Sequence, residues 1–428
     1  MKWDKVYHLV HKLAVYFFCI YRIWIRKTGG WKKKKFSREV LVINVHHLGD
    51  SALFLDCLRA LCKYYAEERG YRVRVAGNRE NLAYYKAFGN CRVEEYIALD
   101  ERYGIKEYRF GIGGFRQAYQ YLNTLKAEVV AVPFYNIYGI LLSACVESKN
   151  QYIVQDPEDR LSGSRIYRYI CGRAGNHVVM RGKWNEMWLT SYRNLLREMG
   201  IRDYHSKIGR IEAGAIGDPG VRDACRELGE FCVIVPGAKE DARRWEVYKF
   251  AEVIRMINKE MGLGVVLAGA KGEAGIGEEL ERACKEEGRL VNLTGKTGFN
   301  DLAAVIAGSR FVFGNDTGTI HIAAALGIPS LYVMSHKDVG KCQPYELDET
   351  VCSDRIPEGI WSREKPLCAG CRINSEAGGR NNIKWPDERC RRSVCAGGPF
   401  YCLSAIEAEQ VKRKLRRKWE EWQKERKE

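Results

Sequence analysis

The sequence predicts an α/β protein built from two doubly wound domains, each a parallel β-sheet covered by helices. From residue 38 onward, short β-branched runs alternate with helical patterns of about 10–15 residues, the spacing of right-handed crossovers between parallel strands. The alternation breaks off and restarts near residues 212–228, which indicates two such domains facing one another. The length of 428 residues suffices for two or three domains with separate cores.

The first series begins with a buried strand over 39–45, followed by a helix over 51–70 that ends at a glycine. Three more strands are expected, at 71–77, 94–100 and 127–134. Residues 135–215 mix aromatic and polar positions and have a less regular pattern.

The second series is more regular, with strands predicted at 231–237, 264–270, 290–295, 311–316 and 330–335. We therefore divide the chain into four parts. They are an N-terminal extension (1–37), a first Rossmann-like α/β domain (38–225), a second (226–345), and a Cys-rich segment with a basic C-terminal helix (346–428).

The composition is that of a folded, basic protein. Hydrophobic residues make up 46% of the chain and charged residues 29%, which excludes a disordered, a collagen-like and a polytopic membrane protein. Lys and Arg number 70 against 54 Asp and Glu, so the net charge of +16 favours nucleic acid, acidic lipid headgroups or phosphorylated substrates as partners. No signal peptide is visible, and we expect a reducing, cytosolic compartment.

Residues 1–36 predict an amphipathic helix followed by a run of lysines at 32–35. The longest charge-free run, 13–21, is about half of the roughly 20 residues that a spanning helix needs. An interfacial helix on an anionic membrane surface is one interpretation, and a helix packed on the protein's own core is the other. The expected apolar face comprises Val6, Val10, Leu13, Phe17, Tyr21 and Trp24, and the opposite face His8, His11, Lys12, Arg22 and Arg26.

The strand at 311–316 runs directly into an Asn-Asp-Thr-Gly turn and a helix, which places the turn at the carboxyl end of a strand, where ligands bind. The first-turn amides of the helix can bind a phosphate, and the hydroxyls of Thr317 and Thr319 add donors. Asp316 suits a sugar hydroxyl better than a phosphate, because like charges repel. The alternative is that Asp316 or Thr317 caps the helix and His321 packs in the core.

Two further loops carry candidate chemistry. Asp50 follows the first strand and could act as a general base that takes the proton of an acceptor hydroxyl, or it could simply cap its helix. Lys239, Arg243 and Arg244 follow the strand at 231–237 and could hold a diphosphate, or they could form a solvated basic loop.

Together these stretches resemble glycosyltransferase family 9, the lipopolysaccharide heptosyltransferases. NDTGTIHIAAALGIPSLYV (315–333) resembles the donor-site signature of that family, and INVHHLGDSALFLDCLRAL (43–61) resembles its acceptor-side motif. PGAKEDARRWEVYKFAEVI (236–254) is similar to the loop that brings a cation to the donor phosphates, with Arg243 where family members commonly carry lysine.

The resemblance implies a GT-B fold of two Rossmann-like domains. It also implies an inverting, metal-independent transfer of a heptose-like sugar from a nucleotide diphosphate donor, such as ADP-heptose, to lipopolysaccharide or another cell-surface glycan. Asp50 would be the catalytic base, in an acceptor-side turn with His47, Gly49 and Ser51. The implied donor-binding residues are Lys239, Arg243, Asn315, Asp316, Thr317, Gly318, Thr319 and His321.

Seven of the sixteen cysteines fall between Cys342 and Cys402. Cys368 and Cys371 form a CxxC pair, and with Cys390 and Cys395 they could hold a structural zinc ion. Packed free thiols and a disulfide are the alternatives, and a reducing compartment disfavours the disulfide.

We therefore expect a cytoplasmic glycosyltransferase, peripheral on the inner face of the cell membrane, that needs no cofactor for catalysis. One alternative is a same-fold hexosyltransferase with a different donor. The other is a non-catalytic zinc- or nucleic-acid-binding protein, although nucleic acid is the less favoured partner because the basic segment lacks interleaved aromatic residues.

Overall fold

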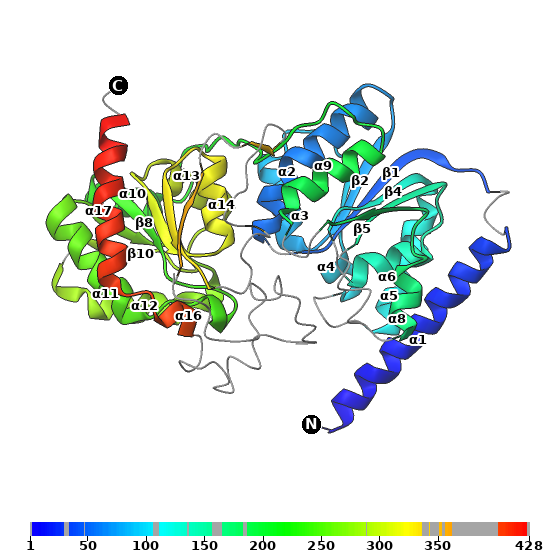
Figure 1. Cartoon of the computed structure of the whole chain (residues 1–428), viewed down its shortest axis with the longest axis horizontal. Coiled ribbons are helices and arrows are strands. Elements are labelled where there is room, and N and C mark those ends of the chain that lie inside the picture. The colour runs from blue at the N-terminus through cyan, green and yellow to red at the C-terminus, as the bar shows by residue number, and fades with distance from the viewer. Residues whose placement is uncertain are drawn as a thin grey trace. The chain divides into compact units, whose positions relative to one another are not determined.

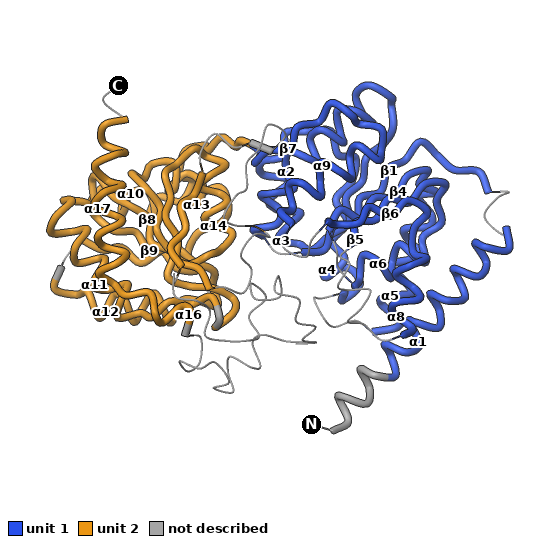
Figure 2. Tube along the Cα trace, viewed as in Figure 1, with its two compact units in different colours: residues 1–209, 349–352 blue, residues 210–348, 353–428 orange. Residues whose placement is uncertain are grey.

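The chain folds into two compact units in the computed structural model (Figure 2). Unit 1 comprises residues 1–209 and 349–352, and unit 2 comprises residues 210–348 and 353–428. The residues that the structure describes are 2–29, 34–46, 48–105, 111–134, 137–155, 165–182, 186–287, 289–335, 342, 351–352, 356–361 and 401–425.

Unit 1 contains a six-stranded, fully parallel sheet in the order β3-β2-β1-β4-β5-β6. Its central strand β1 is buried from Glu39 to its end, as expected of a strand covered on both faces. The strands are β1 (Ser37–Asn44), β2 (Arg72–Gly77), β3 (Glu95–Ala98), β4 (Ala127–Val132), β5 (Asn150–Gln155) and β6 (His177–Met180), and the two-residue β7 (Ser206–Lys207) pairs with β13 (Val351–Cys352) outside this sheet.

Helices cover both faces of this sheet, with α2 and α9 on one face and α5, α6 and α8 on the other (Figure 1). The helices of unit 1 are α1 (Lys2–Lys27), α2 (Leu48–Cys62) with its π-helical extension η1 (Lys63–Glu67), α3 (Arg79–Phe88), α4 (Leu99–Tyr103), α5 (Ile112–Thr124), α6 (Ile137–Cys145), α8 (Arg165–Cys171) and α9 (Trp188–Glu198).

Unit 2 repeats the design with a second parallel sheet in the order β10-β9-β8-β11-β12-β14. Its strands are β8 (Phe231–Val235), β9 (Gly264–Leu267), β10 (Leu290–Asn292), β11 (Val312–Asn315), β12 (Ser330–Val333) and β14 (Glu358–Ile360). Its helices are α10 (Pro219–Leu228), α11 (Val247–Met256), α12 (Ala274–Ala283), α13 (Phe299–Ala307), α14 (Gly318–Ala325), α16 (Tyr401–Ser404) and α17 (Ala408–Glu425), with short turns η2 (Asp241–Arg243), η3 (Ile257–Met261), η4 (Lys271–Glu273) and η5 (Lys285–Glu287).

The division between the units differs from the predicted boundary at residue 225, which falls inside α10. Unit 1 ends at Gly209, and α10 packs on β9 and β10 of unit 2. The start of α10 is well defined, because the Asp218 carboxylate accepts a hydrogen bond from the Val221 amide and Pro219 occupies the first turn. The sequence pattern showed only a break over 212–228 and could not assign this helix to one domain.

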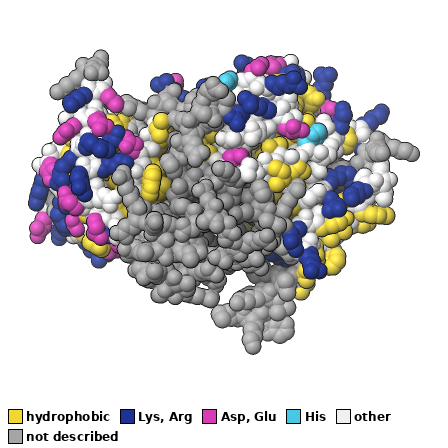
Figure 3. Space-filling model, viewed as in Figure 1, with side chains coloured by type: hydrophobic (Ala, Val, Ile, Leu, Met, Phe, Trp, Pro, Cys, Tyr) yellow, Lys and Arg dark blue, Asp and Glu magenta, His cyan; other side chains and the backbone are white. Residues whose placement is uncertain are grey.

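Helix α1 packs on the α5, α6 and α8 side of unit 1, where Val15, Cys19 and Ile23 enter the core. Arg22 and Arg26, which the helical pattern places on the face opposite the predicted apolar one, point into the unit. Arg22 pairs with Glu147, and Arg26 donates to the Gln151 side chain and to backbone carbonyls near α8. One face of α1 therefore packs on unit 1, whereas Val10, Leu13, Phe17, Tyr21 and Trp24 of the predicted apolar face are exposed (Figure 3). No helix among the described residues is long and apolar enough to cross a membrane.

The ion pair at Glu147 predicts an acid-sensitive attachment of α1. Burial alone would raise the pKa of the Glu147 carboxyl, but hydrogen bonds from Lys34 and Arg22 outweigh burial and lower it. A carboxyl whose folded-state pKa is lowered stabilises the fold above its unfolded pKa, about 4.3, and this contribution is lost as the pH falls through the folded value. Hydrogen exchange in α1, corrected for intrinsic rates, should show a loss of about 1–2 kcal/mol between roughly pH 5 and pH 3.

Glu147→Gln should flatten this pH dependence, because glutamine does not titrate. Glu68→Gln is the matched control, since Glu68 forms an exposed pair with Arg69 on η1's C-terminal side. The same pH dependence in the wild type and in Glu147→Gln would show that another group controls the attachment.

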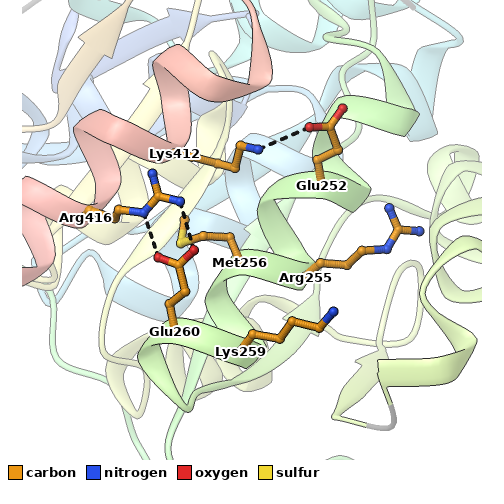
Figure 4. Close-up of a pocket in the computed structure, with 7 residues that line it drawn as sticks. All are labelled: Glu252, Arg255, Met256, Lys259, Glu260, Lys412 and Arg416. Atoms are coloured by element: carbon orange, nitrogen blue, oxygen red, sulfur yellow. Dashed lines mark hydrogen bonds and ion pairs between the residues drawn. The ribbon is translucent and has the colours of Figure 1, made fainter.

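Helix α17 completes the core of unit 2 rather than forming a separate C-terminal segment. Leu415 and Trp422 are buried, and the Trp422 ring lies 5.5 Å from the Phe311 ring, centroid to centroid. On the outer side, Arg416 forms a two-point ion pair with Glu260, at 2.7 and 2.8 Å, and Lys412 contacts Glu252 (Figure 4).

Candidate functional site

The predicted donor residues flank the point where the strand order of unit 2 reverses. β8 and β11 are neighbours at the centre of the sheet, with β9 and β10 beyond one and β12 and β14 beyond the other. Ligands of open α/β sheets bind at such a switch point, outside the carboxyl ends of the strands. Lys239 and Arg243 follow β8, and the 315–321 turn follows β11, so the fold brings the two predicted donor segments to one edge.

Asn315 joins these two segments. Its side-chain amide donates to the carbonyls of Pro236 and Gly237, at 2.7 and 3.3 Å, and its Oδ1 accepts from the Trp245 amide at 3.0 Å. The residue is fully buried. Asn315 therefore positions the loop after β8 and does not itself lie at the surface of the site.

The loop after β8 is also braced by one of its own cations. Arg244 donates to the Ala238 carbonyl at 2.7 Å and pairs with Asp241 at 2.8 Å. Arg243 is 32% exposed with Glu240 as a loose ion-pair partner at 3.8 Å, and Lys239 is exposed. Of the three cations, Arg244 is thus structural, while Lys239 and Arg243 carry the positive charge at this edge.

The Thr317 hydroxyl is left without a partner by the part of the chain that the structure describes. It is the N-cap residue of α14, with extended backbone angles of φ −140° and ψ 170°, but its side chain makes no capping hydrogen bond. The hydroxyl oxygen is buried and has no hydrogen-bond partner among the described residues. The suggestion that Thr317 caps the helix is therefore wrong. A buried, unpaired hydroxyl beside the first-turn amides of a helix is well suited to an anionic ligand.

The remaining predicted donor residues are largely covered by protein. Asp316, Thr319 and His321 are 6%, 9% and 3% exposed, whereas Gly318 is half-buried. The Asp316 amide donates to the Val333 carbonyl at 3.0 Å, which extends the β11–β12 pairing into the turn. Burial raises the pKa of Tyr332, and the nearby charge of Asp316 raises it further, so this tyrosine stays neutral beside the carboxylate.

Glu273 is a residue of this edge that the sequence reasoning missed. It lies after β9, and its carboxylate accepts a hydrogen bond from the Ala270 amide at 2.8 Å. A Cβ atom placed on Gly237 would lie 2.6 Å from Glu273 Oε2, so the glycine lets this carboxylate approach the end of β8. Burial raises the pKa of Glu273, partly offset by the Ala270 hydrogen bond and by Arg244. The available signal was an acidic residue in the loop after β9, because an acidic residue that follows a strand binds ribose hydroxyls in related folds.

Unit 1 has its own switch point between β1 and β4, and the predicted base lies next to it. Asp50 is in the first turn of α2, directly after β1, and is 8% exposed. The His46 ring, also after β1, lies 4.9 Å from the Phe134 ring after β4, centroid to centroid.

A buried polar network supports the turn that carries Asp50. The Asn81 amide lies 2.8 Å from both His46 Nδ1 and the Ser51 hydroxyl, and the Asn44 amide donates to the Tyr85 hydroxyl at 3.0 Å. Ser51 is fully buried, so it supports the turn from inside; Gly49 is half-buried. His47 lies outside the described residues.

The predicted zinc ligands Cys368, Cys371, Cys390 and Cys395 also lie outside the described residues, so the zinc site stays a prediction. The groove between α11 and α17 contains none of the predicted site residues (Figure 4). Arg416 and Lys412 line this groove and form ion pairs with Glu260 of η3 and Glu252 of α11. These ion pairs hold α17 against α11 and η3.

Comparison with known proteins agrees with this arrangement. Residues 176–366 match the family described as glycosyltransferase family 9 (heptosyltransferase). The chain is 40% identical over 107 residues to lipooligosaccharide heptosyltransferase 2 of Haemophilus influenzae, which covers 24% of this chain and 31% of the relative. It is 29% identical over 127 residues to lipopolysaccharide heptosyltransferase 1 of Escherichia coli K12, covering 29% and 38%. These alignments span about a third of the curated relatives' length.

Solved structures match over nearly their whole length. A glycosyl transferase family 9 protein from Veillonella parvula aligns with a TM-score of 0.62 at 16% identity, covering 88% of this chain and 96% of that one. The E. coli ADP-heptose lipopolysaccharide heptosyltransferase II aligns with a TM-score of 0.60 at 17% identity, covering 88% and 97%. At these identities the similarity is one of fold, and it confirms the predicted GT-B class with two Rossmann-like domains.

Proposed function

The chain carries a glycosyltransferase family 9 (heptosyltransferase) domain over residues 176–366, and from this premise we propose that it transfers a heptose-like sugar from a nucleotide diphosphate donor. The proposed donor is ADP-heptose and the proposed acceptor is lipopolysaccharide or a related cell-surface glycan. The observation that carries the proposal is the unsatisfied Thr317 hydroxyl at the start of α14, at the switch point of unit 2.

The donor diphosphate is proposed to bind at the start of α14. The first-turn amides and the Thr317 hydroxyl donate to phosphate oxygens, and Arg243 and Lys239 from the neighbouring loop supply the countercharge. Glu273, in η4 after β9, is a proposed acceptor for ribose hydroxyls.

The proposed chemistry is a single displacement with inversion. The Asp50 carboxylate removes the proton of the acceptor hydroxyl, whose oxygen forms the new bond to the anomeric carbon as the bond to the nucleotide diphosphate breaks. The leaving diphosphate gains charge, which the α14 amides and Arg243 stabilise, so the proposed mechanism needs no metal ion. We place the enzyme in the cytoplasm, peripheral on the inner face of the membrane that holds such an acceptor.

A thermal-shift comparison of ADP, UDP and GDP tests the donor site. A nucleotide present at 100 times its dissociation constant should stabilise the native protein by about 2.7 kcal/mol. ADP should be the effective ligand, and Thr317→Val should weaken its binding about tenfold, because a hydrogen bond to a charged group contributes about 1.5–3 kcal/mol. The melting temperature without ligand should not change, since the hydroxyl makes no capping bond.

Thr124→Val is the matched control, because Thr124 is an exposed threonine of α5 in the other unit. Stabilisation by UDP or GDP in place of ADP would favour the same-fold hexosyltransferase. Stabilisation by zinc or an oligonucleotide, with no nucleotide effect, would reject the transferase and favour the binding protein.

A further inference from the structure

Helix α1 presents a continuous apolar stripe to solvent on the side opposite its packed face. The stripe is spaced three or four residues apart, so its members lie on one side of the helix. Its residues Val10, Leu13, Phe17, Tyr21 and Trp24 are 58%, 38%, 63%, 55% and 59% exposed. In the space-filling view, yellow side chains accordingly gather along α1, with Lys and Arg beside them (Figure 3).

This concentration sets α1 apart from the rest of the described surface. Of the ten large hydrophobic residues that are exposed in the described part of the chain, five belong to this stripe. A sixth, Ile112, begins α5 beside the stripe's N-terminal end, where its backbone amide donates to His11 Nδ1 at 3.2 Å. Contiguous exposed apolar surface of this kind marks an interaction site.

The packed face of α1 keeps the stripe directed outward. Val15, Cys19 and Ile23 are fully buried in unit 1, and Arg22 is paired with Glu147. A rotation that hid the stripe would expose these three apolar side chains and separate the ion pair. Solvent exposure of the stripe is therefore built into the attachment of α1 and does not result from a loosely held helix.

The chemistry around the stripe selects its partner. Tyr21 and Trp24 stack on each other with ring centroids 6.3 Å apart, and aromatic residues of these two types prefer the headgroup level of a bilayer. Lys27 ends the same helix, and Lys34 and Lys35 follow it, all three exposed. Such lysines attract anionic lipid headgroups. A second copy of this chain, with a net charge of +16, would instead bring like charges together.

We propose that the outward stripe of α1 inserts into the headgroup–acyl boundary of an anionic lipid bilayer, with α1 lying in the plane of the membrane and unit 1 above it. The inference deepens the proposed function, on which it rests for the presence of a membrane-bound acceptor. Its test requires no nucleotide, acceptor glycan or sugar transfer, so it can fail while the transferase proposal stands, and the reverse.

The test is sedimentation of the full-length protein with vesicles of phosphatidylcholine alone and with about one third phosphatidylglycerol. The wild type should bind the anionic vesicles, more weakly as salt is raised, because screening weakens the lysine–headgroup attraction. The double variant Phe17→Ser/Trp24→Ser should bind at least about tenfold more weakly, since each side chain loses most of its apolar burial in the bilayer. Lys27→Glu/Lys35→Glu should reduce binding to anionic vesicles only, because both lysines are exposed and neither contacts Glu147.

Tyr248→Ser is the matched control, because Tyr248 is an equally exposed aromatic residue, 61%, on α11 of unit 2. It should bind vesicles as the wild type does. Circular dichroism melts verify that the variants are folded, as expected for substitutions at exposed positions. Three outcomes overturn the proposal: no vesicle binding by the wild type, equal binding by Phe17→Ser/Trp24→Ser, or a wild-type dimer in light scattering that this double variant converts to a monomer.

Discussion

Asp50→Ala should lower kcat for sugar transfer by about 10²–10⁴-fold, the usual contribution of a positioned general base. The affinity for the nucleotide donor should stay within about twofold, because Asp50 follows β1, whereas the residues proposed to bind the donor follow β8 and β11. Steady-state kinetics with a nucleotide-heptose donor, together with direct titration of the nucleotide, separate the two quantities.

Asp203→Ala is the matched control, since Asp203 is an exposed aspartate of the same unit and should leave kcat unchanged. Unchanged turnover in Asp50→Ala would remove Asp50 from the mechanism.

Lys249→Ala should detach the C-terminal helix from unit 2 at a cost of about 2–3 kcal/mol, the value of hydrogen bonds made by a charged donor. Lys249 is 2% exposed, and its ammonium donates to the carbonyls of Ser404 and Ile406 at 2.5 and 3.2 Å. These carbonyls belong to the segment that leads into α17. Hydrogen exchange across 408–425 measures the loss directly, because it reports local opening.

The effect should extend to the loop after β8, which is proposed to bind the donor. Trp245 Nε1 donates to the same Ile406 carbonyl at 2.8 Å, and the Trp245 amide is held by Asn315. A loosened 404–406 turn therefore releases Trp245 as well, and nucleotide binding should weaken in Lys249→Ala although Lys249 lies outside the proposed donor site.

Lys412→Ala provides the control for loss of a lysine in this region. Lys412 forms partly solvated ion pairs with Glu252 and Glu409, which contribute about 0–1 kcal/mol. The stability cost of Lys249→Met should fall between those of Lys249→Ala and Lys412→Ala. Methionine restores the apolar volume but leaves the Ser404 and Ile406 carbonyls without a donor. If Lys249→Ala costs no more than Lys412→Ala, the buried ammonium does not anchor the segment.

The sequence predicted the fold well where strands were continuous apolar runs between amphipathic helices, as at 39–45 and in the series from 231 to 335. It did not resolve β5, which mixes polar and aromatic side chains, or β6, which is only four residues long. Gln151 and Gln155 of β5 are buried yet polar, and each is satisfied by carbonyls that only the folded chain brings near.

The candidate site was predictable at the level of loops, because strand ends in a parallel sheet meet at one edge. The roles of individual residues could not be predicted. Asn315 was grouped with the donor-binding residues, but its partners lie more than sixty positions away in sequence at Pro236, Gly237 and Trp245. The position of Glu273 beside Gly237 is likewise a product of the β8–β9 pairing and has no local signature strong enough to identify it.

Helix α1 shows the same limit. Helical spacing identified the apolar stripe and placed Arg22 and Arg26 on the opposite face, but it did not show that this opposite face packs on unit 1. Their partners Glu147, Gln151 and the carbonyls of residues 173 and 174 are distant in sequence, so their burial could not be deduced from α1 itself.

The late position of α17 in the sequence has a consequence for how the protein is made. The strands of unit 2 from β8 to β12 leave the ribosome before α17, whose Trp419 and Trp422 cover Phe311 at the edge of the core. At about 5–20 residues per second, on the order of ten seconds passes between the synthesis of Phe311 and that of these tryptophans. During that interval Phe311 lacks the two rings that cover it, so unit 2 can complete this part of its core only after α17 has been synthesised.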